Sequence, residues 1–321
     1  MKVLIVRFAA IGDCVMTAWA VTAVRVAAPH AKITWAVQDK CSPVIDTSQL
    51  VDKVLEFPRG RWKKKRWSPN TWREQIVKYT ELRSEGFDLG FDFQGHSKTA
   101  LCLRLAGCKR RLSSRATDAL AAALNPPSQL SPDGPHEVEL AMALVRLGID
   151  CELPPRPLMP KVSHRVSPLR QSLNLDGEVV TIQTGAGEVD KRYPLESWVE
   201  VARQLQSRGL RVVAMGGDGD PKLPNDVAID CVGKFDLVES LALINSSSVH
   251  LAADTGTGHA AAAYGVPVVS IFGRTDPARF RPWTKEGLVL REGRTTNAVH
   301  PEQVVESALV LLKESGVASA R

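Results

Sequence analysis

The spacing of hydrophobic residues predicts buried strands that alternate with helices along the whole chain. Residues 3–8 form an apolar run broken only by Arg7, and a turn at 9–13 leads into a helical stretch at 14–28 that ends before Pro29. Strands that are apolar on both faces and separated by helices pair in parallel, covered on both sides. The sequence therefore predicts an α/β fold built of doubly wound parallel sheets.

This alternation occurs twice. In the first half we expect further strands at 33–37, 54–57 and 89–93 and helices at 71–85, 97–106 and 136–147. In the second half we expect strands at 179–183, 211–215, 229–232, 249–253 and 266–272 and helices at 195–208, 237–245, 260–263 and 301–314. The proline-rich stretch 150–168 is typical of a linker. We expect two Rossmann-like domains, 1–155 and 156–321, facing a cleft, with the last helix free to pack back on the first domain.

Residues 248–283 carry the clearest chemical pattern. An apolar strand ends at Asp254, and a turn of small residues, 255–258, opens a helix. Unpaired amides at such a helix start favour a phosphate group. Three interpretations remain open here: a nucleotide-sugar diphosphate site, an NADP-dependent oxidoreductase that uses Gly256-x-Gly258-x-x-Ala261, and a turn that serves only helix–sheet packing. A dehydrogenase normally places its glycines after the first strand of the nucleotide domain, whereas these come late.

Composition narrows the class of protein. The chain has 321 residues, 44% hydrophobic and 24% charged, which suits a soluble globular protein of two domains. Six scattered cysteines without CxxC pairs indicate reduced thiols in a cytosol and no structural metal site. Arg7, Gly12 and Asp13 interrupt the N-terminal apolar run, so we do not expect a signal peptide, and no apolar stretch is long enough to span a membrane. A net charge of +6 favours acidic partners.

Polar residues at strand ends are the candidates for chemistry. Asp13 stands where the first strand meets its helix, and it is either a general base for a sugar hydroxyl or a capping residue. Lys191 follows the glycine turn 184–187 and would place a positive charge beside a leaving diphosphate, unless it is a solvated surface residue. Asp218 and Asp220 are explained by turn chemistry, so we predict no bound metal ion, although one acid could bind a ribose.

Residues 59–67 form the densest run of positive charge, interleaved with two tryptophans. Such a run suits nucleic acid or a phosphate-bearing membrane surface. No nucleic-acid module surrounds it, so we expect a mobile loop that binds an anionic glycolipid, with a merely solvated loop as the alternative. His96 has no visible partner in the sequence and is left out of the catalytic set.

Together these residues resemble the bacterial heptosyltransferases of lipopolysaccharide core assembly, glycosyltransferase family 9. The resemblance spans most of the chain and rests on the opening Val-Leu-Ile-Val-Arg-Phe-Ala-Ala-Ile-Gly-Asp, the basic loop, Asp92-x-Gln94-Gly95-x-x-Lys98, Asp190-Lys191-Arg192-Tyr193-Pro194-x-x-x-Trp198, Asp254-Thr255-Gly256-x-x-His259 and Gly273-x-Thr275-Asp276-Pro277. Arg274 departs from it, because the family often has proline there, and Gly258 replaces a small hydroxyl residue.

The resemblance implies an inverting, metal-independent transferase of GT-B fold that moves a heptose or related sugar from an ADP-sugar to a phosphorylated lipopolysaccharide core or glycolipid acceptor. It implies that Asp13 and Lys191 are catalytic. The implied donor-binding residues are Thr184, Gly185, Lys191, Asp220, Phe235, Asp254, Thr255, Gly256, Thr257, Gly258 and His259, in a C-terminal nucleotide-sugar-binding domain. The implied acceptor-binding residues are Arg61, Lys63, Lys64, Gln94 and Lys98, in the N-terminal domain.

Further expectations concern partners and location. We expect no cofactor beyond the ADP-sugar substrate, no nucleic acid, a monomer, and a cytoplasmic enzyme that acts at the inner face of the cytoplasmic membrane, with peripheral attachment left open. Besides the oxidoreductase, a non-catalytic glycan-binding protein remains an alternative.

Overall fold

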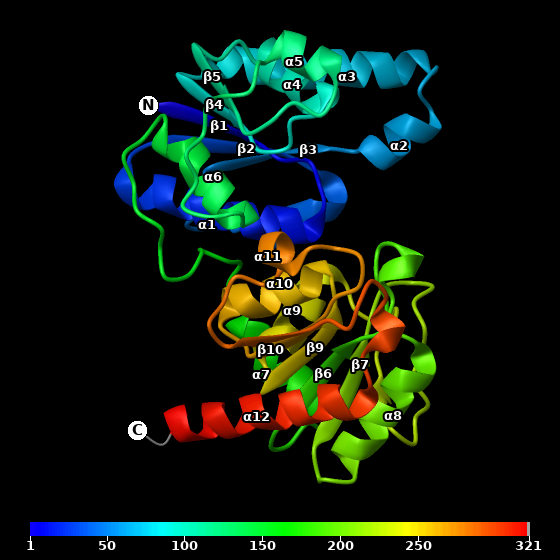
Figure 1. Ribbon diagram of the computed structural model, residues 1–321. Coiled ribbons are helices and arrows are strands. Elements are labelled where there is room, and N and C mark those ends of the chain that lie inside the picture. Colours follow the sequence, from blue (N-terminus) through cyan, green and yellow to red (C-terminus); the bar gives the residue numbers. More distant parts are fainter. Residues whose placement is uncertain (320–321) are drawn as a thin grey trace. The chain divides into compact units, whose positions relative to one another are not determined.

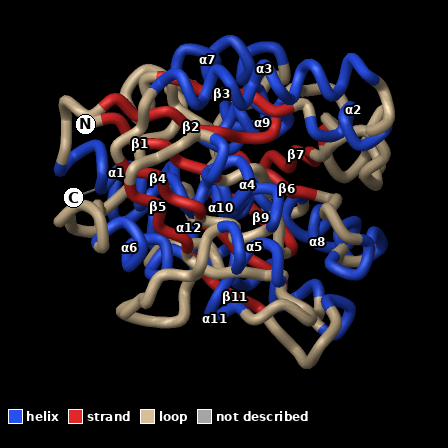
Figure 2. The backbone as a smooth tube through the Cα atoms, turned by 90° about the horizontal axis from the view of Figure 1, so that it is seen from above, coloured by secondary structure: helices blue, strands red, loops and turns tan. Residues whose placement is uncertain are grey.

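Each half of the chain builds one wholly parallel β-sheet with helices on its faces, which confirms the predicted fold class. The computed structural model describes residues 1–319, and the chain forms two units, Met1–Pro160 and Lys161–Arg321 (Figure 1). Strands and helices alternate through most of each unit (Figure 2). The division falls five residues after the boundary expected from the sequence.

The sheet of the first unit has the order β3-β2-β1-β4-β5. Its strands are β1 (Lys2–Val6), β2 (Lys32–Gln38), β3 (Lys53–Phe57), β4 (Leu89–Asp92) and β5 (Arg110–Ser113). The central strand β1 pairs with β2 and β4, so that Val6 lies between Ala36 and Asp92. The chain runs outward from β1 first to one edge and then to the other, which places a switch point between β1 and β4.

Helices cover both faces of this sheet. They are α1 (Ile11–Ala27), the short 3-10 helix η1 (Asp39–Val44), α2 (Arg59–Lys64), α3 (Pro69–Glu85), α4 (Ser97–Leu105), α5 (Ala119–Leu124) and α6 (Glu137–Arg146). Figure 1 shows α1 and α6 on one face and α3, α4 and α5 on the other. The core under α3 and α4 joins Leu82 and Leu103 to Leu4 and Val6 of the central strand.

The sheet of the second unit has the order β11-β10-β9-β6-β7-β8. Its strands are β6 (Val179–Gln183), β7 (Arg211–Met215), β8 (Ile229–Asp230), β9 (Val249–Ala253), β10 (Val268–Ile271) and β11 (Gly287–Leu290). Here β6 is the first strand and pairs with β7 and β9, so the switch point lies between β6 and β9.

The helices of the second unit form two layers. They are α7 (Ser163–Ser172), η2 (Val189–Lys191), α8 (Leu195–Gln206), α9 (Leu237–Asn245), α10 (Gly256–Tyr264), α11 (Pro277–Phe280), η3 (Thr296–Ala298) and α12 (Pro301–Ser319). The final helix α12 packs on α8 and on β9, β10 and β11 through Val304, Ala308 and Leu311. The other layer contains α7, α9 and α10.

Several expected boundaries were wrong. Helix α1 begins at Ile11 and α10 at Gly256, so the turns before them are shorter than predicted. The stretch 59–67 is not a loop but contains the helix α2. Helix α7 begins at Ser163, inside the predicted linker, and β5, β11 and α5 were not predicted. The missed segments are short or polar: β5 and β11 have four residues each, α5 has six, and α7 buries none of its residues, so none shows a clear apolar period.

Candidate active site

The first unit gathers polar groups at the switch point of its sheet. Arg7 follows β1, and Phe93 and Gln94 follow β4, its neighbour. The side-chain oxygen of Gln94 accepts a hydrogen bond from the Phe8 amide at 3.1 Å. Asp92, at the end of β4, accepts from the amides of Gln94 and Gly95, each at 2.9 Å. Burial raises the pKa of the Asp92 carboxyl, although these amides oppose the shift.

Asp13 lies in the first turn of α1, beside this cluster. Its Oδ2 accepts hydrogen bonds from the Ala10 amide at 2.9 Å and pairs with Arg7 Nη2 at 2.7 Å. The Asp13 side chain keeps 27% exposure, whereas that of Arg7 keeps 9%. Asp13 therefore has the bonding of a capping residue and also presents a carboxylate that solvent or a ligand reaches.

Arg7 holds this carboxylate in place. Its guanidinium also donates to the Phe93 carbonyl, so it ties the end of β4 to the start of α1. Burial alone would lower the pKa of Arg7, but the charge and hydrogen bond of Asp13 outweigh it, and the pKa lies above its ordinary value. A buried guanidinium needs such partners, because an unpaired charge away from water is costly.

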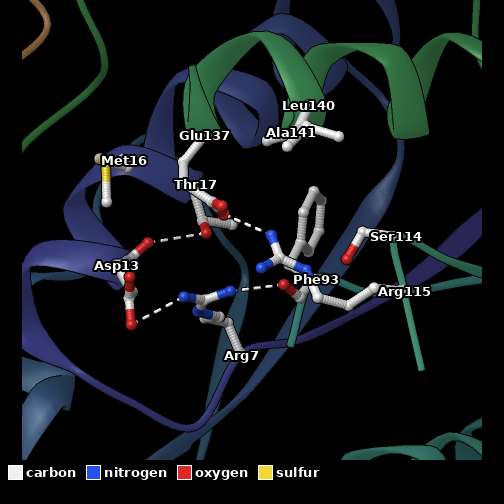
Figure 3. Close-up of a pocket in the computed structure, with 10 residues that line it drawn as sticks. All are labelled: Arg7, Asp13, Met16, Thr17, Phe93, Ser114, Arg115, Glu137, Leu140 and Ala141. Atoms are coloured by element: carbon white, nitrogen blue, oxygen red, sulfur yellow. Dashed lines mark hydrogen bonds and ion pairs between the residues drawn. The ribbon is translucent and has the colours of Figure 1, made fainter. Parts of the chain in front are cut away.

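A small recess of about 10 Å³ opens beside Asp13 (Figure 3). Arg7, Asp13 and Thr17 line one side of it, and Arg115 and Glu137 line another. Arg115 and Glu137 form an ion pair of 2.5 Å, and Glu137 is the first residue of α6. The recess thus carries two carboxylates and two guanidinium groups, and its volume holds about one water-sized group.

The predicted acceptor residues lie on α2, on the turn after β4 and on α4. Lys63 and Lys64 are exposed, and Arg61 donates two hydrogen bonds of 2.9 Å to Glu74. Lys98 is half-buried, and burial together with Arg59 and Lys63 lowers the pKa of its amino group. These cations are neighbours, so an anion would relieve their mutual repulsion.

The second unit repeats the arrangement at its own switch point. The turn at Thr184–Gly185 follows β6, and Asp254 and Thr255 follow β9, the adjacent strand. Lys191, on η2, pairs with Asp254 through Nζ and Oδ2 at 2.7 Å. Helix α10 begins directly after Thr255, so its first amides open beside this ion pair. A lysine next to a helix N-terminus is well suited to bind a diphosphate.

Asp220 packs closely against the glycine turn. A Cβ atom on Gly185 would lie 1.9 Å from the carboxyl carbon of Asp220, so no larger residue fits there without movement. Asp220 accepts the Gly217 amide at 2.9 Å, as expected of turn chemistry, and pairs with Arg192 at 3.4 Å. Its carboxylate is therefore part of a polar cluster after β7.

The other predicted donor residues differ in their surroundings. Thr184 is buried, and its hydroxyl donates to the Met215 carbonyl at 3.4 Å. Thr255 and Thr257 exchange a hydrogen bond of 2.9 Å at the start of α10, where the partly exposed Gly256 lies between them. A Cβ on Gly258 would lie 3.5 to 3.8 Å from Pro282, Ser270 and Val268, which is ordinary contact, so packing does not require a glycine there. His259 is buried on α10, and the half-buried Phe235 lies between β8 and α9.

Three residues of this geometry were not in the predicted set. Arg7 was noted only as an interruption of the first strand, and Glu137 only as part of a helix. Arg274 pairs with Glu188 and, at 2.9 Å, with Asp190, and thereby holds the segment that carries Lys191. Arg274 follows β10 at the same edge of the sheet, and this position in the sequence could have identified it as part of the site.

Other sequence candidates have local explanations. His96 is not without a partner, because its Nδ1 lies 2.7 Å from the Thr117 hydroxyl, and burial lowers the pKa of the imidazole. Across residues 1–319 no group of three or more histidine, cysteine and acidic side chains is placed to hold a metal ion. Within the same residues, no helix has both the length and the apolarity needed to cross a bilayer.

The comparison with protein families gives one match. The sequence profile described as "Glycosyltransferase family 9 (heptosyltransferase)" matches residues 77–308, most of the chain. This range contains Gln94, Lys98 and the whole polar cluster of the second unit, whereas Asp13 precedes it.

Individual relatives agree with this match. Lipopolysaccharide heptosyltransferase 1 of Escherichia coli K12 is 25% identical over 304 residues, which cover 92% of this chain and 94% of that protein. The structure titled "E. coli heptosyltransferase WaaC with ADP" superposes with a TM-score of 0.80 at 22% identity, covering 97% of this chain and all of the other. The structure titled "E. coli heptosyltransferase WaaC with ADP-2-deoxy-2-fluoro heptose" gives a TM-score of 0.77 at 22% identity, covering 98% and 100%.

Proposed function

Because the chain belongs to glycosyltransferase family 9, the heptosyltransferases, we propose that it transfers a heptose from ADP-heptose to a phosphorylated lipopolysaccharide core or related glycolipid, with inversion at the anomeric carbon. The ADP and the ADP-heptose analogue named for its structural relatives support this donor. We place the reaction at the cytoplasmic face of the inner membrane and expect a monomer.

The observation that carries the proposal is the Lys191–Asp254 pair at the head of α10. It combines a cation, free helix amides and a carboxylate at the switch point of a parallel sheet, where ligands of this fold bind. In the proposed complex the diphosphate lies against the α10 amides and Lys191, Asp254 accepts hydroxyls of the donor sugar, and Asp220 binds the ribose. Phe235 would pack on the adenine.

The proposed reaction is a single displacement. Asp13 takes the proton of an acceptor hydroxyl, whose oxygen forms a bond to the anomeric carbon as the bond to the diphosphate oxygen breaks. The electron pair of that bond leaves on ADP, and attack from the opposite face inverts the centre. Lys191 and the α10 amides stabilise the charge that develops on the diphosphate. Arg61, Lys63, Lys64, Gln94 and Lys98 would hold the phosphorylated acceptor.

Of the two alternatives to a transferase, family membership argues against the NADP-dependent oxidoreductase, and the non-catalytic glycan-binding protein still needs an experimental test. Family membership makes the chain a transferase, so the glycines after Thr255 are not interpreted as an NADP site. A non-catalytic glycan-binding protein would bind acceptor and donor without releasing ADP. Incubation with ADP-heptose and a phosphorylated core oligosaccharide tests this, because we expect stoichiometric ADP and a glycosylated product, and binding without ADP release would disprove the proposal.

Metal independence follows from the proposed charge stabilisation. Lys191 and helix amides take the part that a divalent ion takes in metal-dependent sugar transferases, so chelation by EDTA should leave turnover unchanged. Loss of turnover on chelation, restored by one divalent metal, would contradict this part of the proposal.

A further inference from the structure

Large apolar side chains are exposed together where α2 leads into α3. Trp67 is 80% exposed, Trp72 55% and Ile76 64%, and Val77 on the next position is also exposed. Trp72 and Ile76 are four residues apart on α3, so they lie on one face of that helix. By contrast, Trp19 and Trp35 of the same unit are almost wholly buried. Contiguous exposed apolar side chains indicate an interaction surface rather than chance exposure.

Positive charge surrounds these side chains. Lys63, Lys64, Lys65 and Arg66 precede Trp67, and Arg73 follows Trp72; all five are exposed. Residues 59–73 contain no aspartate or glutamate. We call this set, Lys63–Trp67 with Trp72, Arg73, Ile76 and Val77, the α2–α3 surface.

The acidic residues of α3 are engaged elsewhere. Glu74 pairs with Arg61 and accepts the indole N–H of Trp62 at 2.8 Å, while Glu81 and Glu85 pair with Lys53 of β3. These contacts fix α2 and the flank of α3 against the sheet. They leave Trp72, Arg73 and Ile76 facing outward on the opposite flank of α3, while the exposed Val77 lies nearer the glutamates.

We propose that the α2–α3 surface docks the protein on a bilayer that contains anionic lipids. Tryptophan is favoured at the boundary between head groups and hydrocarbon. Ile76 and Val77 would be stabilised by burial in hydrocarbon, whereas neither can form a hydrogen bond or ion pair with a polynucleotide. The cations match the negative surface potential of such a bilayer. In Figure 1, α4 and α5 lie with α3 on the same face of the sheet, and Leu101, Leu105 and Leu120 on them are exposed, so apolar contact can extend along that face.

The proposal is tested by sedimentation of the full chain with vesicles of phosphatidylcholine alone or mixed with phosphatidylglycerol. The apolar variant is Trp67→Ser/Trp72→Ser/Ile76→Ser, and the charge variant is Lys65→Ser/Arg66→Ser/Arg73→Ser. The control is Val26→Ser, since Val26 is a comparably exposed apolar residue at the end of α1. We expect binding to the anionic vesicles that weakens with salt, a loss of about tenfold or more in each triple variant, and no change in the control.

Equal binding to both kinds of vesicle would overturn the proposal, and so would triple variants that bind like the unmodified protein. Preferential binding of a single-stranded oligonucleotide that displaces the vesicles would overturn it as well. Docking and catalysis can fail separately. The variant Trp72→Ser/Ile76→Ser lies outside the predicted acceptor-binding run 59–67 and should glycosylate a deacylated, water-soluble acceptor as the unmodified protein does. Absence of transfer by the unmodified protein would disprove the proposed function and leave the vesicle result standing.

Discussion

At the residue scale, the proposed mechanism depends on the carboxylate of Asp13. Asp13→Asn keeps the shape of the side chain and removes the proton acceptor, so we expect turnover to fall by ~100- to 10,000-fold. Because the donor site is assigned to the second unit, ADP affinity should persist. Steady-state kinetics and calorimetric titration with ADP measure the two quantities.

Glu137→Gln is the matched control, because Glu137 is the second carboxylate in the same recess and is also paired with an arginine. Its turnover should stay within about tenfold of the unmodified protein, a change of ~1.4 kcal/mol in the barrier. A loss of ADP affinity in Asp13→Asn equal to the loss of turnover would mean that Asp13 is structural. A larger loss of turnover in Glu137→Gln than in Asp13→Asn would indicate that Glu137, not Asp13, is the general base.

Gly185 offers a second test at this scale. Gly185→Ala would place a methyl group against the Asp220 carboxylate, where a glycine alone fits. We expect displacement of Asp220 and at least a tenfold weaker affinity for ADP, about 1.4 kcal/mol. Gly187→Ala is the control, because a Cβ there has no neighbouring atom within 4 Å. Equal ADP affinities in the two variants would mean that Asp220 and its turn do not belong to the donor site.

The sequence was enough to identify polar residues at strand ends, because parallel sheets bring those ends to one edge. Asp13, Lys191, Asp220 and Asp254 were predicted as site residues on this basis, and their roles stay predictions. The partners that fix them were not, since Arg7 meets the Phe93 carbonyl and Arg274 meets Glu188 only when residues 86 positions apart in sequence come together. No local spacing records such contacts.

At the element scale, central strands were predictable and some edge strands were not. The buried runs of β1, β6 and β9 read as strands because both of their faces are covered. The missed strands β5 and β11 are edges of their sheets, and β5 opens with two arginines. Helix α2 lacks apolar periodicity and is held instead by Trp62, which packs on Phe57 and donates to Glu74.

Strand β9 makes the stability of the second unit depend on pH. His250 is fully buried there, its Nδ1 lies 2.9 Å from the Thr181 hydroxyl, and burial lowers the pKa of the imidazole to about 3. The folded unit keeps His250 neutral, whereas the unfolded chain takes up a proton near its ordinary pKa of 6.5. The stabilisation is therefore complete above pH 6.5 and is lost as pH falls from 6.5 toward 3.

Between pH 7 and pH 5 this residue should cost the second unit about 2 kcal/mol of unfolding free energy. Hydrogen exchange of peptides that cover β9, corrected for intrinsic rates, measures the difference. His250→Asn cannot titrate in this range and should show a correspondingly smaller change between the two pH values. An unchanged pH dependence in that variant would assign the effect to other groups.

At the scale of the whole molecule, the same strand order is used twice with different polar groups. In the first unit the switch point holds Asp13, Arg7 and a recess, and in the second it holds Lys191, Asp254 and the start of α10. The proposed function assigns the carboxylate base to the first unit and diphosphate binding to the second. A single displacement needs both in one reaction, so the proposed function assigns one substrate to each unit.

Hydrogen exchange can separate these assignments in the intact protein. We expect ADP to protect segments 184–192, 216–220 and 254–259. At an ADP concentration of about 100 times its Kd, amides there that exchange only after the ligand leaves should exchange about 100-fold more slowly. ADP lacks the transferred sugar, so residues 7–17 should be unchanged by it. A non-transferable ADP-heptose analogue, together with acceptor, should add protection at residues 7–17, because the acceptor hydroxyl must then contact Asp13. Protection at 7–17 by ADP alone, with none at 254–259, would reverse the assignment of donor and acceptor and leave Lys191 without its proposed role.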